Sequence, residues 1–348
     1  MFDLTQQNTF RLPAFAKKFI SLDSLDSVKN LPKDKILFLG QGSNVLFRSS
    51  IFPLVVANRL TGFNITKDKD NAVDVEFASG HNWHDAVMWS VENSLSGMEN
   101  MAFIPGTVGA AAIGNIGAYG GNQEDLFVSL KAFDLHTRKE EIFTKKDMNF
   151  SYRESVFKHE LFEKYFVTSV TYRLSRTAHL ETSYSSRYES LSGQLEKIRP
   201  SDPDRPYSIK EVAEAVTALR KSKLPDLSVL GSAGSFFKNP IIPKTTYLDL
   251  KSRLENFQGY PPDKLQYKDE SEWLEKVNKV KIPAGRLLDE LGWKGKRVGN
   301  VGTFEKHALI VVNYGKATGM EVFEFAENMR AAIQKNYNVL LQYEVMII

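Results

Sequence analysis

Apolar residues alternate with polar ones in several stretches, which predicts strands. Val73, Val75 and Phe77 follow the period of two that a half-buried strand requires, and residues 165–174 repeat it. Short apolar runs bounded by turn residues extend the pattern. The further predicted strands are 36–39, 53–57, 129–135, 140–150 and 308–313, with 129–135 and 140–150 paired around the turn at 136–139.

Other stretches follow helical spacing and carry signals for helix ends. Asn82 is placed to cap a helix that runs to Asn93. Ser208 and Glu211 form a capping box ahead of a helix that closes on basic residues near its negative end. Further helices are predicted after Ser24, from 281 to 289 with an end at 292–295, and over 319–336, where one face is apolar.

Residues 97–122 are the densest glycine stretch, and the rest of the chain is organised around them. Eight residues are glycine or Pro105, there is no lysine or arginine, and Glu99 is the single acid. Glycine tolerates positive φ and lets another group approach the backbone, and it disfavours a long helix. The residues alone leave two interpretations open: a wall for a bulky ligand, or a tight loop between packed strands.

A second glycine turn, residues 40–44, directly follows the strand predicted at 36–39. A strand, a glycine turn and then Ser43 and Asn44 form a typical nest of backbone amides for phosphate oxygens. The segment is neither a Walker A loop nor a complete G-x-G-x-x-G fingerprint, because no GK[ST] appears and the final small residue of the fingerprint is missing. A plain turn remains the alternative.

Composition narrows the class of protein. The chain has 348 residues, which favours two or three domains, and its 42% hydrophobic and 25% charged residues are ordinary for a globular protein. A net charge of +3 with interspersed signs gives no reason to expect nucleic acid or a membrane as partner. The absence of cysteine excludes disulfides, Fe–S clusters and thiolate chemistry, and the first residues lack signal-peptide character. We expect a cytoplasmic protein.

Residues 175–206 differ from their surroundings in composition. They are rich in Ser, Arg, Tyr and Pro, which predicts a connecting excursion between domains, with the boundary just after the helix that ends near 223.

Three side chains stand out as candidates for chemistry. Arg153 suits recognition of a carboxylate, although a solvated face would also explain it. Ser235 lies before two phenylalanines outside any G-x-S-x-G motif, and it is either a proton relay or a turn serine. Glu344 is an isolated acid in an otherwise apolar predicted strand, either a buried catalytic carboxylate or an edge residue facing water.

A metal site is not expected. His81 and His84 are three residues apart, but no third ligand follows at useful spacing.

Several motifs, taken in order, resemble the UDP-N-acetylenolpyruvoylglucosamine reductase (MurB) family. The chain carries, in the family's order, NTFRL, LGQGSNVLF, IPGTVGAAAIGNIGAYG, SYRESVFK, KLPD, GSAGSFFKNP, KIPAGRLLDELGWKG and a terminal YEV. Each alone is weak, and the ordered set is specific. The long segment between Tyr172 and the helix near 208 is similar to the type I branch.

The resemblance implies an α+β fold with an FAD-binding domain of the vanillyl-alcohol-oxidase (PCMH) type. This domain would have two subdomains, residues 1–58 and 59–222, and a C-terminal α+β substrate-binding domain would follow at 223–348. It also implies non-covalent FAD, NADPH as co-substrate, and reduction of UDP-N-acetylglucosamine enolpyruvate to UDP-N-acetylmuramate in peptidoglycan precursor synthesis. A monomer is expected.

The resemblance also assigns residues to roles. Arg153, Ser235 and Glu344 match the family's catalytic arginine, proton-donating serine and catalytic glutamate. The cofactor-binding residues would be Gly40, Gln41, Gly42, Ser43, Asn44, Ile104, Pro105, Gly106, Gly109, Ala110, Asn115, Gly117, Ala118 and Tyr119. The substrate-binding residues would be Tyr152, Tyr188, Lys223, Asn239, Tyr260 and Lys294, with Tyr188 preferred over Tyr184 as the tyrosine that closes on the substrate.

The chain departs from the family pattern at three places. The spacing from Tyr260 to Lys281 is longer than usual, His307 replaces a frequent glutamine, and Met346 replaces a frequent arginine. Two other functions stay open: a different FAD-dependent oxidoreductase of the same fold acting on another substrate, and a non-catalytic FAD- or UDP-sugar-binding protein.

Overall fold

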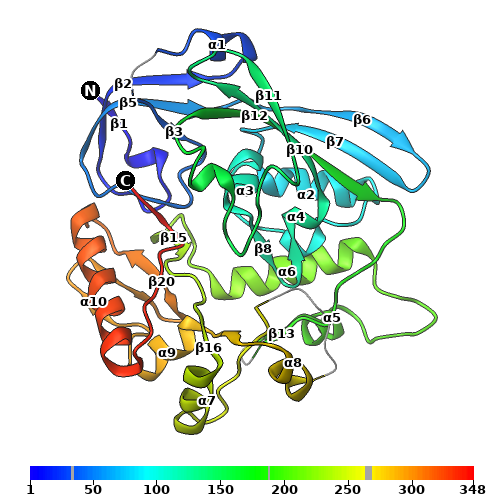
Figure 1. Ribbon diagram of the computed structural model, residues 1–348, viewed down its shortest axis with the longest axis vertical. Helices are drawn as coiled ribbons and strands as arrows, with labels where there is room; N and C mark the ends of the chain where they lie inside the picture. Colours follow the sequence, from blue (N-terminus) through cyan, green and yellow to red (C-terminus); the bar gives the residue numbers. More distant parts are fainter. Residues whose placement is uncertain (33–34, 187–188, 263–268) are drawn as a thin grey trace. The chain divides into compact units, whose positions relative to one another are not determined.

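The chain forms two compact units in the structure, a computed structural model that describes residues 1–32, 35–186, 189–262 and 269–348 (Figure 1). The first unit comprises Met1–Gln7, Ala14–Ser43 and Ile51–Lys223, and the second comprises Asn8–Pro13, Asn44–Ser50 and Leu224–Ile348. In the sequence, the boundary between the longest pieces of the two units lies between Lys223 and Leu224, directly after a helix. The subdivision of the N-terminal region at residue 58 stays a prediction.

The first unit contains two larger sheets, the two-stranded pairs β8-β9 and β13-β14, and the helices around them. Its elements are β1 (Phe2–Asp3), η1 (Thr5–Gln7), β2 (Phe15–Leu22), α1 (Leu25–Lys29), β3 (Leu37–Leu39), β5 (Ile51–Asn58), β6 (Phe63–Lys69), β7 (Ala72–Ala78), α2 (Trp83–Glu92), η2 (Glu99–Met101), α3 (Val108–Gly114), β8 (Gly117–Ala118), β9 (Gly121–Asn122), α4 (Gln123–Leu126), β10 (Phe127–Asp134), β11 (Glu140–Thr144), η3 (Val156–Lys158), β12 (Tyr165–Ser175), β13 (Ser185–Ser186), β14 (Glu189–Ser190), α5 (Leu191–Ile198) and α6 (Ile209–Lys223).

The two larger sheets of the first unit differ in strand direction. In the order β1-β2-β5-β3, strands β2, β5 and β3 run parallel, whereas the order β11-β10-β12-β7-β6 is antiparallel throughout. Leu22 and Val56 of the first sheet share one buried cluster with Phe133 and Phe166 of the second. Burial of such side chains contributes roughly 1.5–3 kcal/mol each, so this cluster joins the sheets into one unit.

Helices cover part of the antiparallel sheet. Val75 and Phe77 of β7 lie in one core cluster with Trp83 of α2 and Val212 of α6, and α3 packs against β7 and β12. The end of α2 agrees with the prediction, since the Asn82 side chain accepts a hydrogen bond from the Asp85 amide at 3.1 Å.

The structure differs locally from the expected elements at four places. Strand β6 was not predicted, because all of its residues are exposed at a sheet edge and no burial enforces alternation. Strand β11 ends at Thr144, short of the predicted 150. Ser24 is the N-cap of α1 but makes no capping bond, and its hydroxyl pairs with that of Ser27. The excursion at 175–206 carries helix α5, whose Leu191 and Leu195 are fully buried, so part of it belongs to the core of the first unit.

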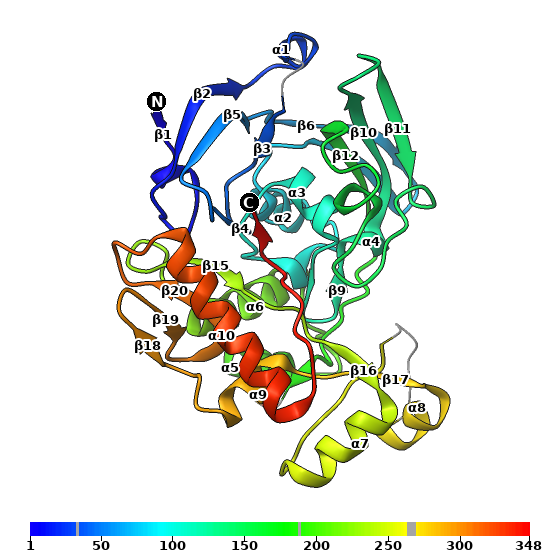
Figure 2. The same ribbon diagram turned by 60° about the vertical axis from the view of Figure 1, so that its left-hand side comes forward.

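The second unit is built on a smaller antiparallel sheet, in the order β15-β20-β19-β18. In Figure 2, α7 and α8 lie beside β16 and β17. The elements of this unit are β4 (Val45–Leu46), β15 (Gly231–Ser235), β16 (Ile241–Pro243), α7 (Lys244–Arg253), α8 (Glu270–Lys276), β17 (Lys279–Lys281), α9 (Ala284–Glu290), β18 (Arg297–Val298), β19 (Val301–Phe304), β20 (His307–Asn313), α10 (Gly319–Tyr337) and β21 (Met346–Ile347).

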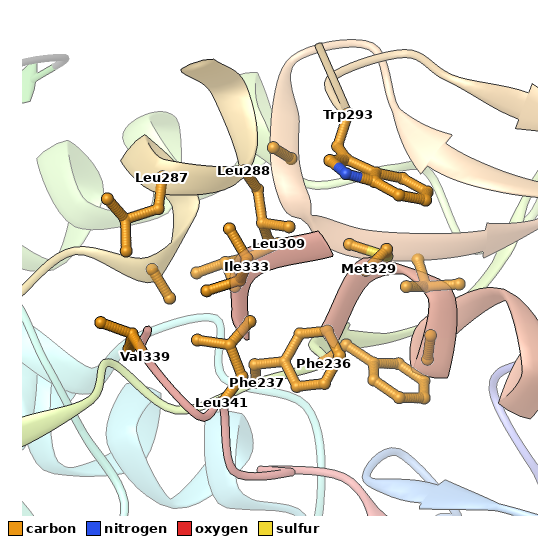
Figure 3. Packing of buried hydrophobic residues seen from close by; sticks show 14 of the residues in the cluster. Phe236, Phe237, Leu287, Leu288, Trp293, Leu309, Met329, Ile333, Val339 and Leu341 are labelled. Carbon is orange, nitrogen blue, oxygen red and sulfur yellow. The ribbon is translucent and has the colours of Figure 1, made fainter. Parts of the chain in front are cut away.

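The core of the second unit joins residues that are far apart in the chain. Figure 3 shows Phe236 and Phe237 in one buried cluster with Met329 and Ile333 of α10 and with Leu341 of the C-terminal segment. The N-terminal residues Phe10, Leu12 and Leu46 belong to the same buried cluster. Strand β4 pairs in parallel with β21, with Val45 opposite Met346. The two short N-terminal pieces are therefore integral to this unit.

Candidate functional site

The two glycine segments predicted from the sequence meet in the first unit. The Gly106 amide donates a hydrogen bond to the Gln41 side chain at 3.0 Å, and the Ser43 hydroxyl donates to the Pro105 carbonyl at 3.2 Å. A Cβ added to Gly40 would lie 3.0 Å from the Thr107 hydroxyl oxygen. The segments thus approach so closely that a side chain at position 40 would crowd Thr107.

The glycine stretch itself folds as a short helix followed by a small hairpin. Thr107 caps helix α3, its hydroxyl accepting from the Ala110 amide at 3.4 Å, and Asn115 ends the helix in the left-handed conformation. Strands β8 and β9 follow, and Tyr119 between them also has positive φ, with its ring 5.2 Å from that of Tyr184. The tight-loop interpretation therefore describes part of the stretch correctly.

The composition of this surface fits a flat, anionic cofactor such as FAD. Pro105 and Ala110 are exposed, Ile104 and Ala118 are half-buried, and Gly106 and Gly109 carry no side chain. Gly109 is packed so closely that an added Cβ would lie 2.8 Å from the Ser79 Cβ. Backbone groups flanked by small residues provide a wall that a wide ring system can approach. Gly42 and Gly117 complete the predicted set in the first unit.

Asn44 is the exception among the predicted cofactor-binding residues, because it belongs to the second unit. Its side-chain amide donates to the Glu344 carbonyl at 3.2 Å, and its own carbonyl accepts from the Met346 amide at 3.0 Å. Asn44 therefore holds the C-terminal segment that carries Glu344.

Arg153 lies against the glycine stretch. Its guanidinium donates to the Asn115 carbonyl at 3.3 Å and also to the Gly117 carbonyl, and it lies 5.3 Å from the centre of the Tyr152 ring. The backbone of Arg153 has φ +60°, a left-handed conformation that is uncommon for a residue with a side chain. The solvated-face alternative is wrong, since the side chain is partly buried and docked on backbone carbonyls.

Ser235 is the last residue of β15 and pairs with Ile310 of β20, so the turn-serine alternative is wrong. The next residue, Phe236, is fully buried, and its amide donates to the Leu309 carbonyl at 2.8 Å. The backbone of Ser235 and Phe236 is thereby held against β20, directly after a bulge in β15 between Ser232 and Ser235.

Glu344 does not lie within a strand, contrary to the prediction. It occupies a bend before β21, and its side chain is neither fully buried nor on an exposed edge. The Glu344 amide donates to the Phe236 carbonyl at 2.9 Å. The candidate glutamate is therefore attached directly to the residue that follows Ser235, and the structure brings these two candidates of the second unit together.

The predicted substrate-binding residues of the second unit lie in different local settings. The Asn239 side-chain oxygen accepts from the Ala284 amide at 3.0 Å, the first residue of α9. Lys294 forms an ion pair with Asp289 at 3.4 Å. Tyr260 is half-buried, which raises the pKa of its hydroxyl.

The long spacing from Tyr260 to Lys281 is accommodated without separating these residues. They form an antiparallel bridge, with backbone hydrogen bonds of 2.8 and 2.9 Å. Helix α8 lies in the sequence between Tyr260 and Lys281, and the bridge keeps the two ends of this longer segment together.

The remaining predicted substrate residues are in the first unit or outside the described ranges. Lys223 is the last residue of α6, and Tyr152 lies beneath the Arg153 guanidinium. Tyr188 lies outside the described residues, whereas Tyr184 packs edge-on against Tyr119.

Sequence reasoning missed residues that hold the glycine segments in place. Arg59 donates to the Gly40 carbonyl at 2.9 Å, and burial lowers the pKa of its guanidinium. Phe103, with φ +59°, has its amide bonded to the His84 ring nitrogen and its carbonyl bonded to Arg220, both at 3.0 Å. No signal in the sequence identifies these residues, because their partners are 19 to 117 positions away.

His81 and His84 accept hydrogen bonds from different backbone segments. His81 accepts from the Gly62 amide at 3.4 Å and His84 from the Phe103 amide. Burial is the main cause that lowers the pKa of both imidazoles. Across the described ranges, no three His, Asp or Glu side chains gather in the way that a metal ion would require.

None of the helices in the described parts of the chain combines the length and the apolar character needed to cross a bilayer.

Comparison with known proteins places these features in context. The family model "UDP-N-acetylenolpyruvoylglucosamine reductase, C-terminal domain" matches residues 225–348, and the model "FAD binding domain" matches residues 28–142. The UDP-N-acetylenolpyruvoylglucosamine reductase of Flavobacterium johnsoniae is 38% identical over 100% of this chain and 98% of the relative. That of Bdellovibrio bacteriovorus is 36% identical over 98% of this chain and 97% of the relative.

A solved structure shares the fold. The crystal structure of the reductase (MurB) from Thermus caldophilus matches with a TM-score of 0.65 and 20% identity, over 99% of this chain and 96% of that one. Together with the two family models, this likeness confirms the prediction of an α+β chain with an FAD-binding domain and a C-terminal domain.

Proposed function

Because the chain belongs to the UDP-N-acetylenolpyruvoylglucosamine reductase family, we propose that it reduces UDP-N-acetylglucosamine enolpyruvate to UDP-N-acetylmuramate at the expense of NADPH. The observation that carries the proposal is the match to a reductase at 38% identity over the whole chain. The FAD binding model over residues 28–142 supports FAD as the cofactor. The product is a precursor of peptidoglycan.

The residues around the two glycine segments would hold FAD without a covalent bond. The side chains of Gln41 and Ser43 join the two segments by bonding to the backbone of Gly106 and Pro105. Bound FAD supplies hydride transfer, first from NADPH and then to the enolpyruvyl double bond.

Arg153 is assigned to stabilising negative charge. Hydride addition at the β-carbon of an enolpyruvate moves electron density toward the α-carbon and the carboxylate. A guanidinium is always charged and presents donors in a planar fork that matches a carboxylate. Docking on the carbonyls of Asn115 and Gly117 orients that fork before the reaction, which is the condition for efficient electrostatic catalysis.

Ser235 is assigned to protonating the α-carbon, and Glu344 to the same catalytic centre. A hydroxyl must be held within reach of the atom that it protonates, and the ordered strand β15 holds the Ser235 backbone. The bond from the Glu344 amide to the Phe236 carbonyl fixes the distance between the two segments. Tyr152, Tyr188, Lys223, Asn239, Tyr260 and Lys294 are assigned to substrate binding.

The proposal includes a monomeric protein of the cytoplasm. The absence of cysteine suits a reducing compartment, and the net charge of +3 leaves no strong field toward nucleic acid or membranes. A mass by light scattering that matches one chain of 39.4 kDa is expected, and a dimer would contradict this part.

The role of Ser235 is tested by separating the two half-reactions. In Ser235→Ala, reduction of the bound flavin by NADPH should stay within about two-fold of the wild type, while reoxidation by the enolpyruvyl substrate slows by about 10²–10⁴-fold, the usual contribution of a positioned acid. Both rates are measured by anaerobic stopped-flow absorbance.

Ser252→Ala is the matched control for this experiment. Ser252 lies on α7 in the same unit, and its exposed hydroxyl donates to the Asp249 carbonyl at 2.7 Å, so its loss removes a serine hydroxyl away from the backbone that holds Ser235. The control should leave reoxidation near the wild-type rate. Equal losses in both half-reactions of Ser235→Ala would contradict the proton-donor role.

A further inference from the structure

A chain of buried side-chain hydrogen bonds leads to Arg153 from the far side of the glycine stretch. The Tyr172 hydroxyl donates to the Gln123 side-chain oxygen at 3.1 Å, and the Gln123 side-chain amide donates to the Asn115 side-chain oxygen at 2.9 Å. Tyr172 and Gln123 are fully buried, and Asn115 is 5% exposed. These groups are remote from solvent and have defined partners.

Asn115 connects this chain to the segment that carries Arg153. Its side-chain amide donates to the Ser151 carbonyl and to the Glu124 carboxylate, both at 2.7 Å, while its backbone carbonyl accepts from Arg153 at 3.3 Å. Both amide hydrogens of Asn115 are thereby used within the protein. The Asn115 side-chain amide therefore has no hydrogen left to donate to FAD. It joins residues 151–153 to the glycine stretch instead.

Both ends of this connection have backbone conformations that need support. Asn115 has φ +43° and Arg153 has φ +60°, and neither is glycine. Such conformations persist where the surroundings over-determine them, and they concentrate at functional sites. The bonds from Asn115 to Ser151 and from Arg153 to Asn115 close a loop that holds both residues.

Gln123 gives this loop a fixed orientation. It follows β9, and its backbone amide donates to the Ile116 carbonyl at 3.0 Å. In the sequence, Ile116 lies between Asn115 and Gly117, whose carbonyls Arg153 contacts. An amide side chain has distinct donor and acceptor ends. With Tyr172 donating at one end, the other end of Gln123 must donate to Asn115, and the Asn115 amide is then turned toward Ser151. Burial raises the pKa of Tyr172, so its hydroxyl keeps the proton that it donates.

We infer that Gln123, supported by Tyr172, is a positioning residue that acts through Asn115 to hold the Arg153 guanidinium in place. The inference rests on the proposed function, in which Arg153 stabilises charge on the substrate. A core amide with a purely structural role would affect stability and would not act on one half-reaction.

Gln123→Met tests this inference, because methionine fills a similar volume and removes both hydrogen bonds. Reoxidation of the reduced flavin by the enolpyruvyl substrate should slow by about 10–100-fold, while NADPH reduction stays within about two-fold, since a small misplacement of a catalytic group can cost that much. Tyr172→Phe keeps the Gln123–Asn115 bond and should slow reoxidation less. This second variant also serves if Gln123→Met does not fold.

Two further measurements separate positioning from general stability. In the Arg153→Ala background, adding Gln123→Met should leave the reoxidation rate unchanged, because the residue through which Gln123 acts is absent. Ser90→Ala is the control, since the buried Ser90 hydroxyl bonds to Val87 on α2 and should affect stability alone. Equal slowing of both half-reactions by Gln123→Met, or a further loss in the Arg153→Ala background, would overturn the inference.

A readout without turnover distinguishes this inference from the proposed function. In ¹⁵N-arginine NMR spectra of the protein without substrate, the Arg153 Nε–H signal, assigned by its loss in Arg153→Lys, should shift or broaden in Gln123→Met and stay unchanged in Ser90→Ala. An unchanged Arg153 signal in Gln123→Met would overturn the positioning role. Failure of the wild-type protein to reoxidise with the substrate, with the NMR change present, would overturn the proposed function alone.

Discussion

Single residues in left-handed backbone conformations support the candidate site. Phe103, Asn115, Tyr119 and Arg153 all have positive φ without being glycine. Arg153 could be selected from the sequence as a candidate cation, because its motif and its chemistry were both visible. The bonds of Arg153 to Asn115 and Gly117 could not be predicted, since they depend on how residues 36 to 38 positions away are folded.

His84 gives a prediction at the same scale, concerning pH. Its ring accepts a bond from the Phe103 amide, so the folded protein favours the neutral imidazole. Burial lowers its pKa, the nearby Lys221 and Arg220 lower it further, and Asp85 opposes them. As the pH falls below the unfolded value of 6.5, the unfolded state binds the proton first, so the free energy of unfolding decreases.

Urea unfolding between about pH 7.5 and pH 5 checks this expectation. The wild type should lose stability across this range, and His84→Gln should lose less. His136→Gln, at an exposed turn position, is the control and should follow the wild type. Equal pH dependence in His84→Gln and the wild type would contradict the assignment.

At the scale of elements, end signals and periodicity predicted most helices and strands well. Asn82 caps α2, Ser208 and Glu211 form the capping box ahead of α6, and α10 covers the predicted apolar stripe. Glu344 shows where this reasoning failed. The apolar residues around it suggested one strand, but the Glu344 amide bonds to Phe236, and this long-range contact produces a bend that local periodicity does not encode.

Helix α10 supports a stability prediction at this scale. Thr318 and Glu321 form a reciprocal capping box, with bonds of 3.2 Å and 2.7 Å. Thr318→Ala should lower the free energy of unfolding by about 1 kcal/mol, because it leaves a helix amide without its acceptor. Thr318→Ser keeps the hydroxyl and should stay near the wild type in thermal unfolding. Similar unfolding of the alanine and serine variants would show that the cap contributes little.

At the scale of the whole molecule, the order of motifs predicted the family, and the full-length relatives confirm it. Which segments of the chain make up each unit was harder to predict from the sequence. Residues Asn8–Pro13 and Asn44–Ser50 belong to the second unit, where Val45 pairs with Met346. Such pairings join residues about 300 positions apart, and no local pattern in the sequence specifies them.

For the whole molecule, the proposed activity is that a non-covalent flavin carries hydride from NADPH to an enolpyruvyl UDP-sugar. The most direct measurement reduces the purified protein with one equivalent of NADPH under anaerobic conditions and then adds UDP-N-acetylglucosamine enolpyruvate. We expect yellow protein, bleaching by NADPH, return of the oxidised flavin spectrum on addition of the substrate, and UDP-N-acetylmuramate as the product. Protein that binds no added FAD, or reduced flavin that stays reduced with this substrate, would contradict the claim.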